Sequence, residues 1–185
     1  SRDTASDAWI SVSAASRPRD DRELTVMFVD VRNFTEISER LAPTDVVAFL
    51  NTLLDALSRH VVANEGTLDK FIGDSIMAFW NAPVDVADHE TKAVRAALAM
   101  RETLAELNAG DAFGFGPEQK VGIGIGIHTG LACVGNMGAK TRFNYSAVGD
   151  AVNVAARLES CCKEVGFDIL ISDSTARSVQ GMALI

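Results

Sequence analysis

GTLDKFIGDSIMAFW, residues 66–80, carries the strongest secondary-structure signal in the chain. Two runs rich in β-branched, aromatic and other apolar residues, Thr67–Ile72 and Ser75–Trp80, flank the pair Gly73-Asp74. Such a pair between two runs of this kind is typical of the tight turn of a β-hairpin. The sequence therefore predicts an antiparallel hairpin with Asp74 in its turn.

The segments before the hairpin alternate in the same way between strand and helix signals. Leu24–Val29 (LTVMFV) is a nearly continuous apolar run, which is typical of a strand buried on both faces. A short helix is predicted over Phe34–Leu41. A longer helix begins at Pro43 and ends at Asn64-Glu65-Gly66, with apolar residues at helical spacing between them.

The segments after the hairpin give a helix and a glycine-rich strand. The helix is predicted over Asp88–Leu107. In Lys120–His128, glycine alternates with β-branched residues, which favours a strand. We expect Leu131–Val134 to pair with this strand after a turn at Gly130.

The last part of the chain contains two more helices and a short strand. A helix over residues 151–164 is capped by Gly149-Asp150, a strand covers Asp168–Ile171, and a helix starts at Ser172. The full order is β-α-α-β-β-α-β-β-α-β-α. A hairpin flanked by helices predicts an α+β sandwich, with a mixed or antiparallel sheet and its helices mostly on one face.

Composition is that of an ordinary globular domain. The 185 residues suit one domain, with 48% apolar and 23% charged residues. A net charge of −8 disfavours nucleic acid as a partner. No uninterrupted apolar run is long enough to span a bilayer. The three cysteines lack metal-ligand spacing, so we expect reduced thiols and a cytoplasmic location.

The first residues differ from the rest in composition. Residues 1–22 are polar and rich in Ser and Ala, which predicts a linker and leaves 23–185 as the folded domain. We expect the linker to follow an upstream regulatory or sensor domain. A membrane anchor of the full-length protein would also lie upstream.

Two aspartates stand in unusual surroundings. Asp30 ends the apolar run FVD, and Asp74 lies in the hairpin turn. A carboxylate beside apolar neighbours is costly to desolvate unless a positive charge compensates. Oxygen ligands without His or Cys favour Mg²⁺ or Mn²⁺, and the carbonyl of Val31 can add a ligand. Alternatively, Asp74 is only a turn residue and Asp30 only a helix N-cap; together, the two contexts favour metal binding.

Four segments of the chain resemble, in order, the signatures of the class III nucleotidyl cyclase catalytic domains of prokaryotes. These segments are FVDVRNFT (28–35), GTLDKFIGDSIMAFW (66–80), GIGIHTG (124–130) and NYSAVGDAVNVAARLE (144–159). The resemblance covers residues 23–180. It implies a ferredoxin-like sandwich, a βαββαβ core with extra elements, that forms a head-to-tail homodimer. Each active site of such a dimer takes its metal carboxylates from one subunit and its base-reading residues from the other.

The resemblance also implies an activity and the residues that perform it. The activity is conversion of ATP to 3′,5′-cyclic AMP and pyrophosphate with two Mg²⁺ or Mn²⁺ ions, as the output of a signal-transduction protein. The implied roles are metal binding for Asp30, Val31 and Asp74, substrate binding for Phe34, Lys70, Arg142 and Ser146, and ribose and α-phosphate contacts for Asn153 and Arg157. The family continues beyond the position of Ile185 into further strands, which we expect to be missing here.

The base-reading pair of the resemblance favours ATP. Lysine at position 70 can donate to N1 of adenine, whereas guanine carries a hydrogen there. Ser146 departs from the Asp of the family pattern, and its hydroxyl can accept or donate, which would weaken base selectivity. A Lys paired with Ser resembles the subgroup associated with bicarbonate stimulation. Guanylate cyclase and a catalytically silent nucleotide-binding or dimerisation module remain the alternatives.

Overall fold

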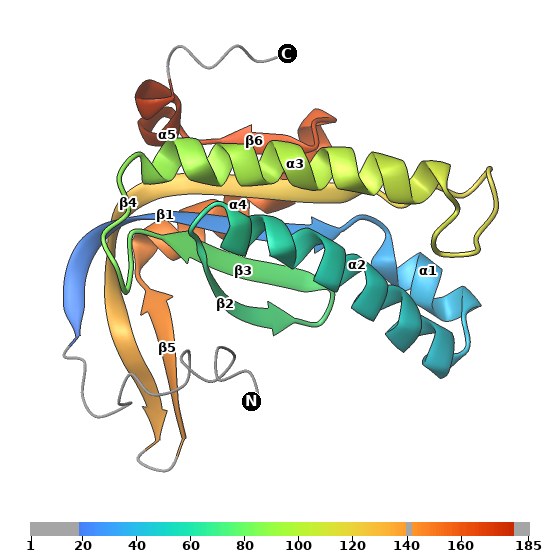
Figure 1. The fold of residues 1–185 in the computed structure, drawn as a ribbon, viewed down its shortest axis with the longest axis horizontal. Coiled ribbons are helices and arrows are strands. Elements are labelled where there is room, and N and C mark those ends of the chain that lie inside the picture. Colours follow the sequence, from blue (N-terminus) through green and yellow to red (C-terminus); the bar gives the residue numbers. More distant parts are fainter. Residues whose placement is uncertain (1–18, 140–141, 180–185) are drawn as a thin grey trace, which may run out of the picture.

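The computed structural model describes residues 19–139 and 142–179, which form one α+β unit (Figure 1). Its elements follow the predicted order of strands and helices. They are β1 (Asp20–Val31), α1 (Phe34–Arg40), α2 (Pro43–Ala63), β2 (Thr67–Ile72), β3 (Ser75–Trp80), α3 (His89–Ala109), β4 (Ile123–Ala139), β5 (Arg142–Val148), α4 (Asp150–Val165), β6 (Ile169–Ile171) and α5 (Asp173–Ser178).

The strands form one mixed sheet in the order β2-β3-β1-β4-β5, and β6 adds to β4. All pairs are antiparallel except β4 with β6. The part β4-β1-β3-β2, with α2 and α3 as the crossing helices, is the predicted ferredoxin-like core. The predicted hairpin is confirmed, with Ile72 opposite Ser75 at its turn.

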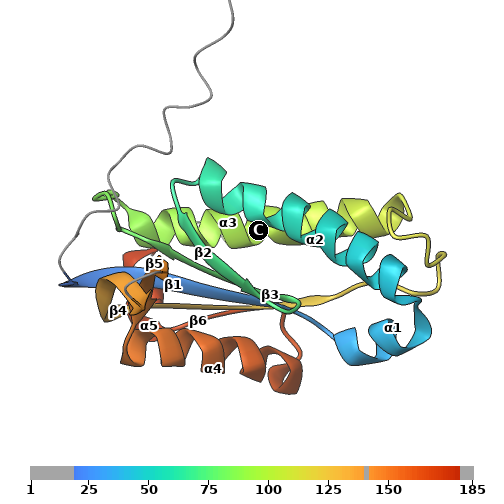
Figure 2. The ribbon, with the colours of Figure 1, turned by 90° about the horizontal axis from the view of Figure 1, so that it is seen from below.

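Helices cover both faces of the sheet. Helices α2 and α3 lie on one face and α4 on the other (Figure 2). Alternate residues of β3 accordingly enter two different cores: Ile76 and Ala78 in one, Met77 and Phe79 in the other. The expectation of helices mostly on one face is therefore wrong. It holds for the ferredoxin-like part, and the added helix α4 covers the second face through Ala151 and Ala155.

Strand β4 corrects a second prediction. It runs without interruption through Gly130, which pairs with Leu24 of β1, so there is no turn at this position. Leu131–Val134 pairs with β1 rather than folding back on β4. The strand that does fold back is β5, which pairs with β4 from Cys133 to Ala139. We did not predict β5 from the sequence, because polar residues interrupt its apolar pattern.

Two glycines of β4 allow α4 to approach the sheet. A Cβ atom on Gly126 would lie 2.2 Å from the backbone nitrogen of Glu159 and 2.3 Å from the carbonyl oxygen of Ala155. A Cβ on Gly124 would lie 2.7 Å from Oε1 of Glu159. The alternation of glycine in this strand is thus a packing requirement of α4, and it fixes where Glu159 lies.

One boundary differs from expectation. Strand β1 begins at Asp20, before the predicted domain start at residue 23, because Asp20–Arg22 pair with Ala132–Val134.

Helix α2 has the length and mean hydropathy of a membrane-crossing helix. It packs in the core through Phe49, Leu53, Leu57 and Val61, so we interpret it as a core helix of the domain.

Candidate active site

A cavity of about 400 Å³ opens where β1 ends and the β2–β3 turn begins. Asp30 and Val31 at the end of β1 and Asp74 in the turn line this cavity. The register of β1 with β3 brings them together, because Val29 faces Ile76. Ser75 donates a hydrogen bond from Oγ to Oδ1 of Asp30. The two aspartates that the sequence singled out therefore meet at one cavity.

A third carboxylate, Glu159 of α4, lines the same cavity. Burial raises its pKa to about 7, and repulsion from Asp30 and Asp74 adds to this effect, while Ser160 and Arg32 lower it. Burial also raises the pKa of Asp74, followed by repulsion from Asp30. Burial first, and repulsion among the three carboxylates second, thus disfavour the ionised forms of Asp74 and Glu159.

The donors of this cavity fit a hard divalent cation. Carboxylate oxygens, with a backbone carbonyl at Val31, are the ligands that Mg²⁺ and Mn²⁺ prefer. A bound cation would relieve the repulsion that raises the pKa values of Asp74 and Glu159. Asp30 and Asp74 are the residues that would hold it, with Val31 as the further ligand.

Two basic residues, Arg32 and Lys163, also line the cavity. Arg32 forms an ion pair with Asp168 at 3.3 Å and donates to the carbonyl of Phe167. Lys163 of α4 donates from Nζ to Oδ1 of Asn33 over 3.2 Å. Phe34, a predicted substrate-binding residue, also lines this cavity, at the start of α1.

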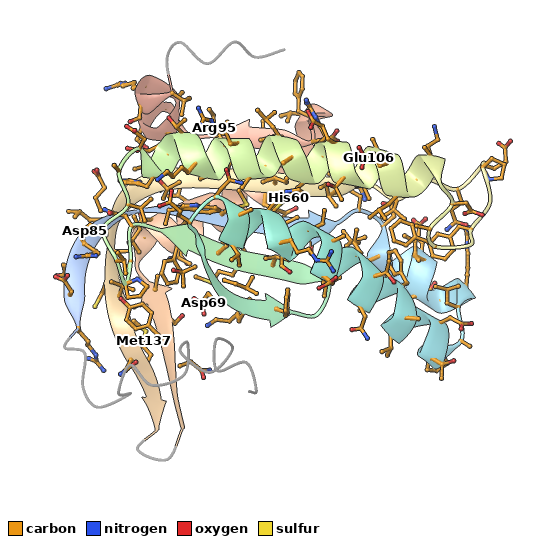
Figure 3. The ribbon with its side chains drawn as sticks, in the orientation of Figure 1. His60, Asp69, Asp85, Arg95, Glu106 and Met137 are labelled. Atoms are coloured by element: carbon orange, nitrogen blue, oxygen red, sulfur yellow. The ribbon has the colours of Figure 1, made fainter. Side chains whose placement is uncertain are left out.

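A second cluster joins β2 to β5. Nζ of Lys70 donates to Oγ of Ser146 over 3.1 Å, so these two predicted residues are in direct contact. Oγ of Ser146 in turn donates to Oδ2 of Asp69 over 2.6 Å. Asp69, labelled in Figure 3, has a fully buried side chain, whereas that of Lys70 is 42% exposed. Neither Lys70 nor Ser146 lines the carboxylate cavity.

The remaining predicted residues lie apart from the carboxylate cavity. Asn153 and Arg157 are exposed on α4, one helical turn from each other. Arg157 has an ion pair with Asp150 at 3.6 Å. Arg142 starts β5 opposite Ala139, and its side chain lies outside the described part of the chain. Within a single chain, the predicted site residues therefore lie in separate groups.

Sequence reasoning missed two residues of these groups, Asp69 and Glu159. Both stand inside the quoted motifs, but neither has an unusual neighbour along the chain. Glu159 is recognisable only from the glycines of β4, which let α4 bring it to Asp30. Asp69 is recognisable only from its hydrogen bond with Ser146.

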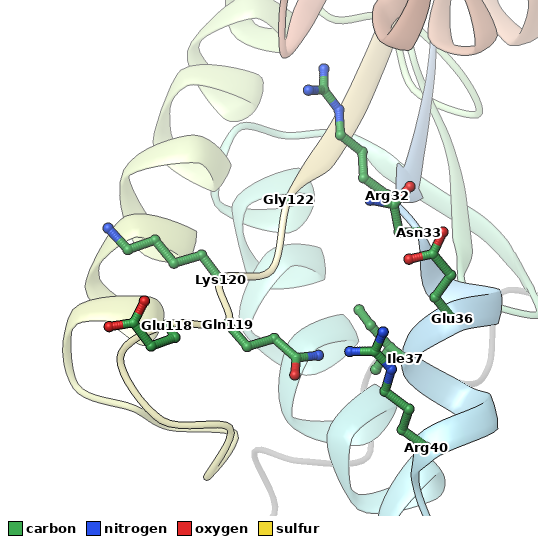
Figure 4. A pocket seen from close by; sticks show the side chains of 9 residues that line it. All are labelled: Arg32, Asn33, Glu36, Ile37, Arg40, Glu118, Gln119, Lys120 and Gly122. Carbon is green, nitrogen blue, oxygen red and sulfur yellow. The ribbon is translucent and has the colours of Figure 1, made fainter.

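A neighbouring cavity of about 500 Å³ lies between α1 and the segment before β4 (Figure 4). Its charged lining is mixed, with Arg32, Arg40 and Lys120 beside Glu36 and Glu118. The basic groups point in different directions (Figure 4), so they do not converge on one anion. None of the predicted site residues whose side chains the structure describes lines it, and we place no substrate there.

Fold and site together define an α+β domain with a carboxylate cavity and a separate Lys–Ser–Asp cluster. Residues 17–184 match the family described as the adenylate and guanylate cyclase catalytic domain. The chain belongs to this family. It is 44% identical to adenylate cyclase 1 of Rhizobium meliloti (strain 1021) over 87% of its length and 36% identical to adenylate cyclase of Anabaena cylindrica over 92%. It spans only 24% and 32% of those proteins.

Solved structures agree with the family. The crystal structure of the adenylyl cyclase CyaB from P. aeruginosa superimposes with a TM-score of 0.80 at 35% identity, covering 89% of this chain and 84% of that one. The guanylyl cyclase Cya2 superimposes with a TM-score of 0.78 at 34% identity, covering 86% and 79%. The fold thus occurs in enzymes named for either nucleotide, so the choice of base depends on particular side chains.

Proposed function

We propose that this chain is the catalytic domain of an adenylate cyclase, which converts ATP to 3′,5′-cyclic AMP and pyrophosphate. The observation that carries the choice of ATP is the pair Lys70–Ser146, joined by a hydrogen bond of 3.1 Å. A lysine ammonium can only donate, and adenine N1 can only accept. The names of the R. meliloti and A. cylindrica relatives support the same substrate.

The reaction joins two groups of one nucleotide. The ribose 3′-oxygen forms a bond to the α-phosphorus, the bond from that phosphorus to the leaving oxygen breaks, pyrophosphate departs, and the hydroxyl proton passes to water. Asp30, Asp74 and the carbonyl of Val31 would hold two Mg²⁺ or Mn²⁺ ions. When bound, such ions lower the pKa of the attacking hydroxyl and neutralise the departing phosphates.

The protein side chains position the substrate. Phe34 lines the carboxylate cavity at the start of α1, where the triphosphate would enter. Arg157 carries a permanent charge and a fork of donors suited to the α-phosphate, and Asn153, on the same helix face, suits the ribose. We assign Arg142 a further phosphate contact. Orientation of the 3′-oxygen toward phosphorus is the main contribution of these contacts.

A second copy of the chain would complete the site. The carboxylates line one cavity, and Lys70 with Ser146 form a cluster that does not line it. In a head-to-tail homodimer, the carboxylates of one subunit face the base-reading pair of the other, so each interface holds two sites. Apolar side chains exposed on the sheet, Phe71, Ile72, Leu131 and Val148, support such an interface.

We further propose that the domain is the output of a longer signalling protein in the cytoplasm, with a regulatory or sensor domain before it. The small share of the curated relatives that the chain spans supports this view. The deciding experiment is a side-by-side assay of ATP and GTP with Mn²⁺ or Mg²⁺. Cyclic AMP as the main product is expected. Main formation of cyclic GMP would instead indicate a guanylate cyclase, and tight nucleotide binding without turnover would indicate a silent module.

A further inference from the structure

We propose that Asp69 determines how this chain distinguishes ATP from GTP, by fixing the hydrogen of the Ser146 hydroxyl. This proposal rests on the function proposed above, in which Lys70 and Ser146 contact the base. Asp69 acts through Ser146 and is therefore a positioning residue. Its effect is to convert a hydroxyl that can donate or accept into one that only accepts.

The contacts of Ser146 determine the direction of its hydrogen. Oγ of Ser146 lies 3.1 Å from Nζ of Lys70 and 2.6 Å from Oδ2 of Asp69. An ammonium only donates and a carboxylate only accepts, so the single hydroxyl hydrogen points at Asp69. One lone pair of Oγ accepts from Lys70. The other stays available to accept a hydrogen bond from a base.

The strand geometry explains how two neighbouring residues reach the same serine. In a regular strand, successive side chains point to opposite faces of the sheet. Strand β2 shifts register here: Leu68 pairs with Ala78 and Lys70 with Met77, so Asp69 is an extra residue without a partner on β3. A bulge of this kind redirects a side chain. It allows Asp69 and Lys70 both to contact Ser146.

The burial of the Asp69 carboxylate is unfavourable for stability, so its position calls for a functional explanation. Its side chain is fully buried, and among the described residues Oδ1 has no hydrogen-bond partner, although Nζ of Lys70 is 3.4 Å away. Ser146 is only 3% exposed. A carboxylate removed from water with one oxygen unsatisfied is unfavourable for stability. A requirement that the Asp69 carboxylate orient and polarise the Ser146 hydroxyl would explain why it is buried beside this serine.

The fixed hydroxyl complements adenine and opposes guanine. Adenine offers an acceptor at N1 and a donor at its 6-amino group, which match a donating Lys70 and an accepting Ser146. Guanine offers a donor at N1 and an acceptor at O6. A freely rotating hydroxyl could turn to donate to O6, but one committed to Asp69 cannot. The departure from Asp at position 146 therefore does not by itself relax base selectivity.

Replacing Asp69 by Asn tests this assignment with almost no change in shape. The amide oxygen would face Lys70, and the amide NH₂ would donate to Ser146, which frees the serine hydrogen for O6 of guanine. We expect the ratio of kcat/KM for ATP to kcat/KM for GTP to fall by about tenfold, which is the typical effect of one mismatched hydrogen bond. The Kd values of α,β-methylene-ATP and α,β-methylene-GTP should show the same shift without turnover.

The control variants separate positioning from a general structural effect. In a Ser146→Ala background, Asp69→Asn should change the ratio by less than about twofold, since its target is gone. Asp55→Asn, which removes an exposed carboxylate on α2, should leave the ratio unchanged. A fall of equal size with and without the Ser146 hydroxyl, or no fall at all, would overturn the proposal.

A double variant that moves the carboxylate from position 69 to position 146 provides a second test. This test remains informative if the Asp69→Asn variant folds poorly. Asp69→Asn combined with Ser146→Asp moves the acceptor to the base itself, and we expect the ATP preference of the wild type to return. A GTP preference in this double variant would overturn the assignment. A wild type that cyclises neither nucleotide would refute the proposed function, an outcome distinct from a wild type that is active but insensitive to Asp69→Asn.

Discussion

Lys70 on β2 and Ser146 on β5 are 76 residues apart in the chain, yet Nζ and Oγ lie within 3.1 Å. Their strands are at opposite ends of the sheet order β2-β3-β1-β4-β5. They meet because β4 continues beyond Asp20, where β1 begins, and extends together with β5 as an arm beside the hairpin (Figure 1). The length of β4 therefore brings Lys70 and Ser146 together.

Reversing the charge at Lys70 should reverse the preferred base. In Lys70→Glu, the side chain accepts instead of donating, so N1 of adenine loses its partner and the hydrogen on N1 of guanine gains one. We expect the ratio of kcat/KM for ATP to that for GTP to fall by at least about 100-fold, because a polar site rejects a mismatched partner strongly. Rates of cyclic AMP and cyclic GMP formation measure this ratio.

Lys120→Glu makes the same change of charge at an exposed residue outside both clusters and is the matched control. Its ratio should equal that of the wild type. If Lys70→Glu loses activity toward both nucleotides in equal proportion, Lys70 does not read the base.

Replacing either of the aspartates proposed to bind metal should abolish activity, and replacing Asp74 should not reduce stability. Asp30→Asn and Asp74→Asn remove the ligands that would hold divalent cations, and we expect cyclic AMP formation to fall by at least about 100-fold. Asp74→Asn also removes the repulsion from Asp30, so the Tm of the metal-free chain should be equal to or higher than that of the wild type. The rise of Tm with Mg²⁺ should disappear.

The Tm measurements distinguish a metal site from a turn residue. If Asp74 only stabilised the hairpin turn, Asp74→Asn would lower Tm and leave the Mg²⁺ effect intact. Asp55→Asn, on the exposed side of α2, should retain both activity and the Mg²⁺ effect.

The sequence predicted an element correctly where local signals, such as turn residues and apolar runs, agreed with one another. The hairpin β2–β3 was predicted with its observed bounds, because the Gly73-Asp74 turn and the flanking apolar runs agree. Strand β5 was missed since Asn144 and Ser146 make it polar. Its pairing depends on the long β4, and Gly130 was misread as a turn although it pairs with Leu24. Such strands are defined by their partners and not by their own composition.

The candidate site divides in the same manner. Asp30 and Asp74 were predictable because a carboxylate at the end of an apolar strand is unusual in any fold. Asp69 and Glu159 were not, since each acquires its role from a tertiary contact: Asp69 from a bulge that aims it at Ser146, and Glu159 from the close approach of α4 to Gly124 and Gly126.

Mixing two inactive variants should restore activity if the site is shared between subunits. An Asp74→Asn chain keeps Lys70, and a Lys70→Ala chain keeps Asp74. In a heterodimer of the two, one site collects both defects and the other collects none. Equal mixing gives half heterodimers with one intact site each, so about a quarter of the wild-type activity is expected.

Co-expression with two different affinity tags, followed by assay of the doubly tagged fraction, measures this directly. In that fraction about half of the wild-type activity is expected, because each dimer has one intact site. A mixture no more active than the two variants assayed separately would show that Asp74 and Lys70 serve the same site from one chain.

Glu159 should make the metal-free chain less stable as the pH rises. Its pKa is raised from 4.5 to about 7, by burial first and then by repulsion from Asp30. Between these values the folded chain retains a proton that the unfolded chain has lost, so the free energy of unfolding falls from about pH 4.5 to pH 7 and levels off above. Because the side chain is only half-buried, we expect an effect of about 1 kcal/mol.

Glu159→Gln removes this titration and should therefore raise the Tm at pH 8 while leaving it nearly unchanged at pH 5. Glu164→Gln, an exposed neighbour on the same helix, should leave the difference between pH 5 and pH 8 as in the wild type. Mg²⁺ should stabilise the wild type more at pH 8 than at pH 5, since a cation favours the ionised carboxylates. Thermal melts at both pH values, with and without Mg²⁺, test these expectations. A Tm difference between Glu159→Gln and the wild type that is the same at both pH values would mean that Glu159 titrates normally and lies outside the field of Asp30 and Asp74.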